Sequence, residues 1–541
     1  MIRDNISRRD FIKITAMTAA ASLVDINSLK ALTGSVKDKD QYPVVLVGSG
    51  LGGLTCAAYL SKAGFPVTVL EQHHKPGGYA TSFRRADFTF EVSLHAMAAS
   101  GNATHAIIKE LGLLEKIELV RLEKSHRRIS KGRDMMLPDR NPEAYIEMLS
   151  GFYPSEKQGI HSFVTEILEI QGEVYRLFQN KNQYTTITFP FQYPGMWGVR
   201  NKTLQDLLDD HVKNPNLKDD LGYLWGYYGL PPSKLSGFYY ANSVADYLKN
   251  GSSYVRGQSQ SLSDALVGII KEHGGLVRLN TPVEEILVKN EAISGVITKG
   301  GEKIPASFVV SNASVPDTFG KLLSKDADGF DYREKISAFR PSISSFCVWL
   351  GLKGNLRGNI PGCNIQVASM GSMEEAFRYA LNCNADKMGY TVTVFDNYYQ
   401  GYSAPEKSTV MITCLSGYQP WRVFEKDYLS NRKKAYYAAK SRIAGTLIHR
   451  AEKDIIPGLS SMIEEMDAST PLTNLRYTGN PEGAIYGYEQ AMNNQFMDRI
   501  KNHTPITGLY LAGAWGYPGG GFTGVMRGGL RTSRLIVESL A

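Results

Sequence analysis

The stretch from Pro43 to Glu71 reads PVVLVGSGLGGLTCAAYLSKAGFPVTVLE. It opens with a short run of β-branched and apolar residues, Pro43–Val47, of the kind that forms a parallel strand buried on both faces. A glycine-rich turn follows, then a helical stretch over 54–62 and a second apolar run, Val67–Leu70. This order predicts a strand–helix–strand unit, the building block of an α/β fold with a parallel sheet.

The turn has the glycine spacing of a dinucleotide-binding loop, G-x-G-x-x-G, at Gly48, Gly50 and Gly53. In such a loop the glycines make a tight turn, let the backbone approach a pyrophosphate and let the helix pack closely on the strand. The start of the following helix favours an anion. Glu71 ends the second strand, where a carboxylate accepts hydrogen bonds from an adenosine ribose. We therefore expect Gly48, Gly50, Gly52, Gly53 and Glu71 to bind a dinucleotide; the alternative is a glycine-rich turn in an unrelated α/β fold.

Gly77 and Gly78 extend the pattern beyond Glu71. This E-x5-GG continuation resembles flavoproteins with two dinucleotide-binding domains, where it places backbone beside the flavin diphosphate. The resemblance favours FAD over NAD as the cofactor. The next run, Phe88–Val92, alternates aromatic with polar or acidic residues, which predicts a half-exposed strand.

Further blocks of the sequence resemble the phytoene desaturase, carotenoid isomerase and retinol saturase group of flavoproteins. Tyr79 stands where many relatives carry Arg, and Gln258 where a second Gly is frequent; both departures fit the saturase and isomerase branch better than the bacterial desaturase branch. The blocks are FEVSLH (90–95), YVRGQSQSLSDAL (254–266), NTPVEEI (280–286), VVSNA (309–313), GLYLAGAW (508–515) and PGGGFTGV (518–525).

The resemblance implies that both ends of the chain hold FAD. It places Val283 near the adenine and a flavin-contacting loop at Gly513, Gly521, Thr523 and Gly524. A helix that begins near Gly524 would direct its positive N-terminus at the pyrimidine end of the flavin, where the reduced ring carries negative charge.

The implied fold class is α/β: a Rossmann-like FAD-binding domain of the two-dinucleotide-binding-domain type, with an inserted α+β substrate domain. A long helix is expected at about 427–453 of the substrate domain. The predicted segments are 40–122, 246–324 and 471–541 for the FAD-binding domain and 123–245 and 325–470 for the substrate domain.

The substrate half is rich in aromatic residues and poor in charge, which suits a lipophilic small molecule. The alternative is that these aromatic side chains simply fill a core. Two residues are candidates for chemistry. His95 follows the predicted strand Phe88–Val92 and would donate a proton or position the substrate, with ordinary packing as the alternative. Tyr486 would orient the substrate or donate a proton, or pack against the flavin ring.

The composition excludes several classes of protein. A net charge of +7 spread over 541 residues is too dilute for a nucleic-acid-binding surface. The five cysteines contain no CxxC pair and are odd in number, so neither a zinc site nor a full disulfide framework is predicted. We expect buried free thiols and no metal.

The N-terminus, residues 1–36, resembles a twin-arginine (Tat) signal peptide. Arg8 and Arg9 precede apolar residues, a lysine and a weakly hydrophobic run over 14–24 that is too short to span a bilayer comfortably. The resemblance implies a folded protein handed to the Tat export machinery, and a periplasmic or membrane-peripheral location. No clean A-x-A cleavage site is present, and the alternative is a chance Arg-Arg before a short amphipathic helix.

These patterns together predict an FAD-dependent oxidoreductase that acts on carbon–carbon bonds of a polyene or isoprenoid by saturation, desaturation or isomerisation. A flavin-dependent amine oxidase and a non-catalytic escort that binds prenyl groups are the alternatives. The electron donor or acceptor is not specified by the sequence, and a peripheral contact with a membrane is left open.

Overall fold

The computed structural model describes residues 36–124, 126–179, 188–324, 330–494 and 499–540. The Tat-like segment predicted at residues 1–36 therefore lies outside the described residues, apart from Val36. The five cysteines are buried and free, as predicted. Within the described ranges, no helix combines the length and apolar character that a membrane span needs, and no group of three His, Cys, Asp or Glu side chains is arranged to hold a metal ion.

β1 (Val44–Val47) lies at the centre of a parallel sheet that collects strands from three distant parts of the chain. Val44 pairs with Val67 on one side and with Phe308 on the other. All four residues of β1 are buried, which explains why its sequence is apolar without alternation. The sheet order is β19-β13-β1-β2-β9, with β2 (Val67–Leu70), β9 (Leu276–Arg278), β13 (Phe308–Ser311) and β19 (Leu509–Leu511).

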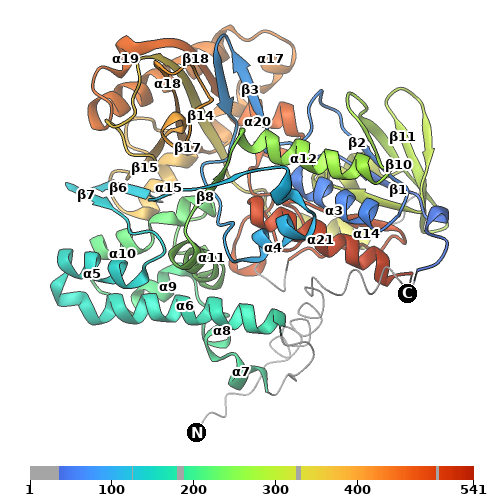
Figure 1. The fold of residues 1–541 in the computed structure, drawn as a ribbon, viewed down its shortest axis with the longest axis horizontal. Helices are drawn as coiled ribbons and strands as arrows, with labels where there is room; N and C mark the ends of the chain where they lie inside the picture. Colours follow the sequence, from blue (N-terminus) through green and yellow to red (C-terminus); the bar gives the residue numbers. More distant parts are fainter. Residues whose placement is uncertain (1–35, 125, 180–187, 325–329, 495–498, 541) are drawn as a thin grey trace.

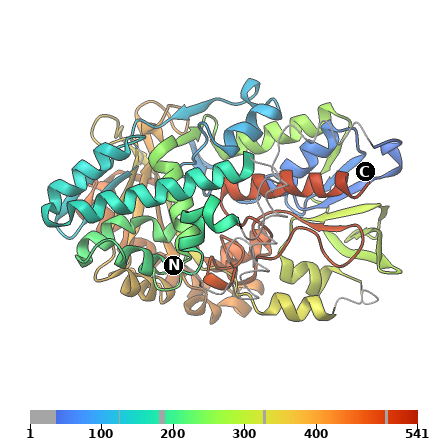
Figure 2. The same cartoon turned by 90° about the horizontal axis from the view of Figure 1, so that it is seen from below.

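Two helices from opposite ends of the sequence pack against each other beside this sheet (Figures 1 and 2). α3 (Leu51–Lys62) follows β1, and α21 (Phe522–Glu538) is the last helix of the chain. Their backbones lie so close that a Cβ atom on Gly529 would be 2.3 Å from the carbonyl oxygen of Gly52. α12 (Gln258–Glu272) also contacts α3. A small antiparallel sheet completes this half with β10 (Val283–Lys289), β11 (Ala292–Thr298) and β12 (Lys303–Pro305).

The other half of the molecule is built on a seven-stranded mixed sheet (Figure 1). Most of its neighbouring strands are antiparallel, but β6 pairs with β15 in parallel. α20 (Pro471–Thr478) lies just past the predicted boundary at residue 470, and its Leu472 packs into the core of this sheet. The order is β18 (Ile463–Ser469), β14 (Ser344–Lys353), β17 (Lys407–Ser416), β16 (Tyr390–Val394), β15 (Asn364–Val367), β6 (His126–Ser130) and β7 (Arg133–Met136).

A helical layer lies along one side of this half, at the lower left of Figure 1. Its amphipathic helices share a separate apolar core, and that core also includes Met373 and Phe377 of α15 (Met373–Leu381). The principal helices of the layer are α5 (Pro142–Phe152), α6 (Lys157–Gln179), α9 (Leu204–Asp209), α10 (Pro215–Leu221) and α11 (Gly237–Asn250).

The single long helix expected at about 427–453 is instead two helices. α17 (Glu425–Leu429) ends early, and α18 (Lys434–Asp454) begins after a turn. Asn431 sits in that turn with φ 60°, the left-handed conformation that Asn tolerates better than most residues and that ends a right-handed helix. The helical composition of the segment was predicted correctly, but this interruption was not.

Candidate active site

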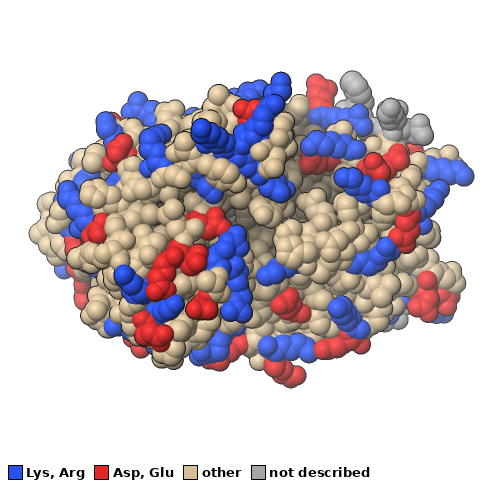
Figure 3. All heavy atoms as spheres, turned by 90° about the horizontal axis from the view of Figure 1, so that it is seen from above, with Lys and Arg blue, Asp and Glu red and all other residues tan. Residues whose placement is uncertain are grey.

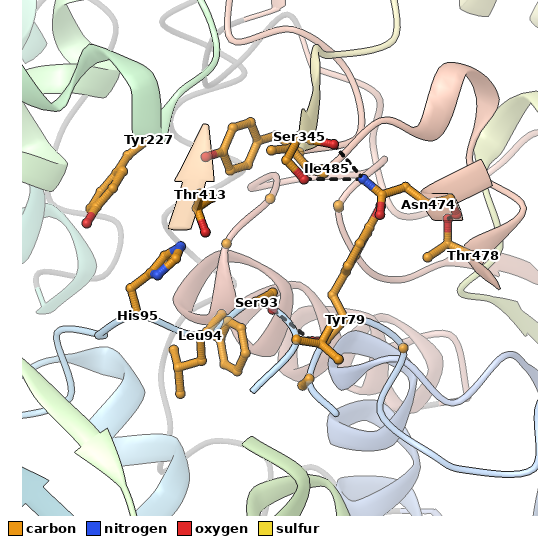
Figure 4. Close-up of a pocket in the computed structure, with 18 of the residues that line it drawn as sticks. Tyr79, Ser93, Leu94, His95, Tyr227, Ser345, Thr413, Asn474, Thr478 and Ile485 are labelled. Atoms are coloured by element: carbon orange, nitrogen blue, oxygen red, sulfur yellow. Dashed lines mark hydrogen bonds between the residues drawn. The ribbon is translucent and has the colours of Figure 1, made fainter. Parts of the chain in front are cut away.

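One continuous cavity of about 1400 Å³ joins the glycine-rich loop of β1 and α3 to the aromatic part of the second half. Pockets for a single small ligand usually measure about 300–1,000 Å³. The cavity therefore has room for a dinucleotide and a second molecule together. Figure 4 shows some of the residues that line it.

The residues predicted to contact the cofactor come together in this cavity. They approach it from both ends of the chain, as expected. Gly53 is the exception: it lies behind the loop, where a Cβ atom would be 2.6 Å from the carbonyl oxygen of Gly48, so its role is in packing. The predicted cofactor contacts that line the cavity are Gly48, Gly50, Gly52, Glu71, Gly77, Gly78, Val283, Gly513, Gly521, Thr523 and Gly524.

The two terminal segments meet at Gly52 and Gly513. A Cβ atom on Gly52 would lie 2.5 Å from the backbone nitrogen of Gly513 and 2.6 Å from its Cα. Contacts this short between a side chain and backbone are not tolerated without movement, and a glycine is therefore required for the two loops to form one surface. The cavity wall beside the first loop depends on this approach.

Asn312 joins the same two segments; it belongs to the VVSNA block, but its contact role was not predicted. Its Oδ1 accepts a hydrogen bond of 3.0 Å from the Gly53 N–H and would lie 2.6 Å from a Cβ atom on Gly513. Its Nδ2 would lie 2.5 Å from a Cβ atom on Gly50. Asn312 follows β13, whose carboxyl end lies beside that of β1 in the parallel sheet. A polar residue at the end of a buried strand was the available indication, since ligands bind at that edge of a parallel sheet.

Two helices present uncapped N-termini to the cavity. Among the described residues, no side chain caps α3 at Gly50 or α21 at Gly521. An uncapped N-terminus has free N–H groups and a partial positive charge, which favour phosphate or an anionic ring. α21 begins at Phe522, slightly before the position expected from the sequence. Both termini fit the charge distribution of FAD, with its diphosphate and its anionic reduced ring.

Glu71 is held rigidly at the end of β2. Its Oε2 accepts hydrogen bonds of 2.7 Å from both the N–H and the hydroxyl of Ser49, and its Oε1 accepts one of 2.9 Å from the His73 N–H. The carboxylate retains acceptor capacity and lines the cavity. This position fits the predicted contact with a ribose.

Glu91 anchors the segment that carries His95. The alternation of Phe88–Val92 predicted a half-exposed strand, but β4 (Phe88–Glu91) ends on a fully buried Glu91. Its carboxylate accepts hydrogen bonds of 2.6 Å from the Tyr254 hydroxyl and 2.6 Å from the Ser259 hydroxyl. Burial raises the pKa of Glu91, although these bonds oppose the shift. A buried carboxylate with all these hydrogen bonds fixes the end of β4, and so fixes the start of the segment that carries His95 into the cavity.

The His95 side chain points into the cavity, toward the space between Tyr227 and Thr413 in Figure 4. Its Nδ1 is buried and has no hydrogen-bond partner among the described residues. Burial lowers the pKa of His95 to about 4. The ring is therefore neutral at physiological pH and is better suited to accepting a proton or orienting a substrate than to donating a proton. Its catalytic role stays a prediction.

His126 lies close to His95 and was not identified from the sequence. Its Nε2 is 3.0 Å from the hydroxyl oxygen of Tyr227, which lines the cavity. Burial, together with the nearby His95, lowers the pKa of His126 to about 3. His126 comes from β6, so only the pairing of a distant strand brings it to this place.

Tyr486 forms part of the cavity wall and is held at both ends. Its N–H donates a hydrogen bond of 2.9 Å to the Ser342 hydroxyl, and its own hydroxyl donates one of 3.3 Å to the carbonyl oxygen of Gly226. Burial raises the pKa of the Tyr486 hydroxyl, so it stays protonated at physiological pH. Its predicted roles in orienting substrate or donating a proton stay predictions.

Aromatic side chains make up the wall beyond His95. Several come from the segment between α10 and the end of α11, so the aromatic residues of the predicted substrate half line the cavity as well as filling a core. The side chains that line the cavity in this part are Tyr223, Trp225, Tyr227, Tyr228, Phe238, Tyr239 and Tyr247.

Comparison with known proteins places the chain among flavoproteins. It is 26% identical to the all-trans-retinol 13,14-reductase of Danio rerio, over 91% of this chain and 86% of that protein. It is 25% identical to the chloroplastic prolycopene isomerase of Daucus carota, over 92% and 80% respectively. These relatives confirm the predicted resemblance to the saturase and isomerase group.

Solved structures confirm the predicted fold class. An oxidoreductase from Methanosarcina mazei superposes with a TM-score of 0.62 at 18% identity, covering 92% of this chain and all of that one. A putrescine oxidase with bound putrescine superposes with a TM-score of 0.60 at 16% identity, covering 92% and 99%.

The sequence pattern described as flavin containing amine oxidoreductase matches residues 51–537. That range runs from the first turn of α3 to the last turn of α21 and so includes both helix N-termini that face the cavity. Because the match extends over most of the chain, the protein belongs to the flavin containing amine oxidoreductase family, and its cofactor is FAD.

Proposed function

We propose that the protein transfers hydride to or from carbon–carbon bonds of a lipophilic polyene or isoprenoid. When bound, FAD accepts or supplies that hydride. The observation that carries the proposal is the continuous cavity, which leads from the nucleotide loop past His95 into an aromatic chamber. The named activities of the relatives, retinol reduction and prolycopene isomerisation, support it.

The charges around the cavity argue against the amine oxidase alternative. Ten Lys or Arg residues line the cavity, against five carboxylates, so a cationic amine would be repelled. Each of the five carboxylates already has a partner: Glu71 (Ser49), Asp219 (Lys131), Asp246 (Asn102), Asp317 (Lys321) and Asp467 (Arg85).

Anaerobic mixing of the holoenzyme with candidate substrates tests the proposal. Reduced and oxidised holoenzyme are each mixed with all-trans-retinol or lycopene, and the oxidised holoenzyme also with putrescine or cyclohexylamine. We expect a polyene to reoxidise the reduced flavin with loss of one carbon–carbon double bond, or to reduce the oxidised flavin with gain of one, and the amines to leave it oxidised. Flavin reduction by the amines, with no response to polyenes, would establish the amine oxidase alternative. Bound FAD that does not cycle with either class would favour a non-catalytic escort.

We also propose that the folded holoprotein is exported by a Tat-like route. Arg8 and Arg9 support this proposal, because the twin arginine is the part of such a signal that the export machinery recognises. Replacing both residues by Lys keeps the charge and should leave the protein in the cytoplasm with FAD bound. Cell fractionation, with flavin content measured in each fraction, checks this. Export of the Arg8→Lys, Arg9→Lys variant at the wild-type level would contradict the proposal.

We further propose that the protein contacts a membrane through the segment from α16 (Gln419–Arg422) to the start of α18. Val423 is 76% exposed and Leu429 is 66% exposed. Basic side chains outnumber acidic ones beside them, and the adjacent Tyr428 and Lys433 line the cavity. Exposed apolar residues with basic neighbours bind anionic lipid surfaces. Figure 3 shows a hollow on one face, with Lys and Arg side chains at its edges.

Replacing Val423 and Leu429 by Asp should weaken binding to vesicles that contain phosphatidylserine by at least about tenfold. Each apolar side chain buried in a membrane contributes about 1.5–3 kcal/mol, and each added carboxylate is repelled. Vesicle sedimentation measures the effect. Leu276→Asp is the matched control, because Leu276 is 59% exposed on the edge strand β9 and does not line the cavity. Equal losses in the control and in the double variant would contradict the proposed surface.

A further inference from the structure

The side chains on one face of β6 form a row that begins near His95 and continues along the cavity. His126, Arg128 and Ser130 are buried on this face, as the alternation of a strand requires. Ile129 points to the opposite side, where it packs in the core of the seven-stranded sheet. His126 marks the end near His95, and Arg128 and Ser130 line the cavity further on. With a rise of about 3.3 Å per residue, Ser130 lies about 13 Å along the strand from His126.

The cavity wall around Ser130 is polar, in contrast to the aromatic chamber. We name this group of residues the far end. Its members come from β6 and the turn after it, from α10 and from β15, which are distant in the sequence. They are Arg128, Ser130, Lys131, Asp219 and Gln366, and all five line the cavity.

The Arg128 guanidinium is fixed in place and keeps free donors. It donates to Oδ1 of Asp220 at 3.1 Å, to Oε1 of Gln366 at 2.9 Å and to the carbonyl oxygen of Asp219 at 3.0 Å. A guanidinium has five N–H donors, so two remain after these bonds. Arg128, Lys131 and Arg133 face Asp219 and Asp220. Together these three basic and two acidic side chains carry one net positive charge.

One buried oxygen atom of the far end is unsatisfied. Ser130 is 3% exposed, and its Oγ has no hydrogen-bond partner among the described residues. A buried polar atom without a partner is costly and therefore rare in native proteins. Since Ser130 lines the cavity, a bound molecule is a natural partner for its hydroxyl.

We propose that the far end binds the oxygen-bearing terminus of an amphiphilic polyene, either a hydroxyl or a carboxylate. The inference rests on the proposed function and narrows its substrate class. Ser130 would donate to the terminal oxygen, and the positive charge of Arg128 would favour a carboxylate. The apolar part of the molecule would then lie along the aromatic chamber, with its middle near His95. A pure hydrocarbon would leave the Ser130 hydroxyl unsatisfied.

Three probes that differ only at one terminus test the inference: all-trans-retinol, all-trans-retinoic acid and the hydrocarbon axerophthene, which is retinol without its hydroxyl. Binding to the oxidised holoprotein is measured from quenching of tryptophan fluorescence, with no turnover needed. We expect both oxygenated probes to bind at least about tenfold more tightly than axerophthene, because each leaves no unpaired group at the far end.

Ser130→Ala separates a direct contact from a change in the shape of the cavity. We expect it to weaken the binding of the two oxygenated probes by about five- to tenfold and to leave axerophthene unchanged. Ser150→Ala is the matched control, since the Ser150 hydroxyl is also buried without a partner among the described residues but does not line the cavity.

The outcomes are distinct. Equal binding of all three probes by the wild-type protein, or an equal loss for all three in Ser130→Ala, would overturn the inference and leave the proposed function standing. Failure of all three to bind would overturn the inference, and it would overturn the proposed function as well only if lycopene also leaves the flavin unchanged.

Discussion

Gly52→Ala should give a folded protein that binds FAD about 10- to 100-fold more weakly than the wild type. The added methyl carbon would lie 2.5 Å from the backbone nitrogen of Gly513, so the loops from the two ends of the chain must separate. Overpacking of this kind costs about 1–3 kcal/mol, and here the displaced groups are those that line the nucleotide end of the cavity. Titration of apoprotein with FAD, followed by flavin fluorescence, measures the effect.

Gly172→Ala is the matched control for that experiment. Gly172 lies within α6, and no atom would be within 4 Å of an added Cβ. The same substitution there should leave FAD binding unchanged and slightly favour the helix. If Gly52→Ala does not fold, its thermal unfolding will show it directly. Gly50→Ala then provides a second test, because its added methyl carbon would lie 2.5 Å from a side-chain atom, the Nδ2 of Asn312, rather than from backbone. Wild-type FAD affinity in both variants would refute the assigned nucleotide site.

His95→Ala should keep FAD and slow substrate-dependent flavin turnover by about 10²-fold or more, the lower part of the range for general acid–base groups. The His95 ring points into the cavity and its Nδ1 has no partner among the described residues, so its removal changes the site more than the core. Stopped-flow measurement of flavin reduction or reoxidation, normalised to bound FAD, separates a catalytic role from a packing role. A normalised rate within about twofold of wild type would remove His95 from the mechanism.

His105→Ala is the control for this variant, because His105 lies on the neighbouring helix α4 (Ala103–Glu110) and does not line the cavity. The pH profile gives an independent readout. Burial lowers the pKa of His95 to about 4, so the neutral ring persists as the pH falls through the ordinary histidine range. We therefore expect the contribution of His95 to be constant from about pH 8 to pH 5 and to be lost toward pH 4. A loss centred near pH 6.5, the ordinary pKa of a histidine, would contradict this account.

The parts of the fold that could be predicted are those determined by residues close together in the sequence. The strand–turn–helix of 44–62 follows from buried valines and from glycines whose spacing has a steric reason. The strand is present where expected, and the helix begins at Leu51, three residues before the expected start. The meeting of the two chain ends could not be derived from local patterns; it came from the resemblance of the block at 508–525 to a known family. The five cysteines were placed correctly because an unpaired thiol is usually buried.

The features that were missed depend on pairing between distant segments. His126 reaches Tyr227, and Ser130 reaches the cavity, only because β6 pairs in parallel with β15, and nothing within β6 specifies that partner. Glu91 was predicted to lie on the exposed face of a strand, because its hydrogen-bond partners, Tyr254 and Ser259, are far along the chain and could not be foreseen from the local pattern. The break at Asn431 depends on one backbone conformation that the composition of the segment does not require.

The joining of α3 to α21 also determines when the protein can acquire its cofactor during its lifetime. Gly529 of α21 packs against Gly52 of α3, and Thr523 of α21 is hydrogen-bonded to Thr104 of α4 across 419 residues of sequence. A nascent chain therefore has only half of the nucleotide-binding site until α21 has been synthesised. FAD must load after that point, and contacts of such long range make folding slow. A chain truncated just before α21 should contain no flavin.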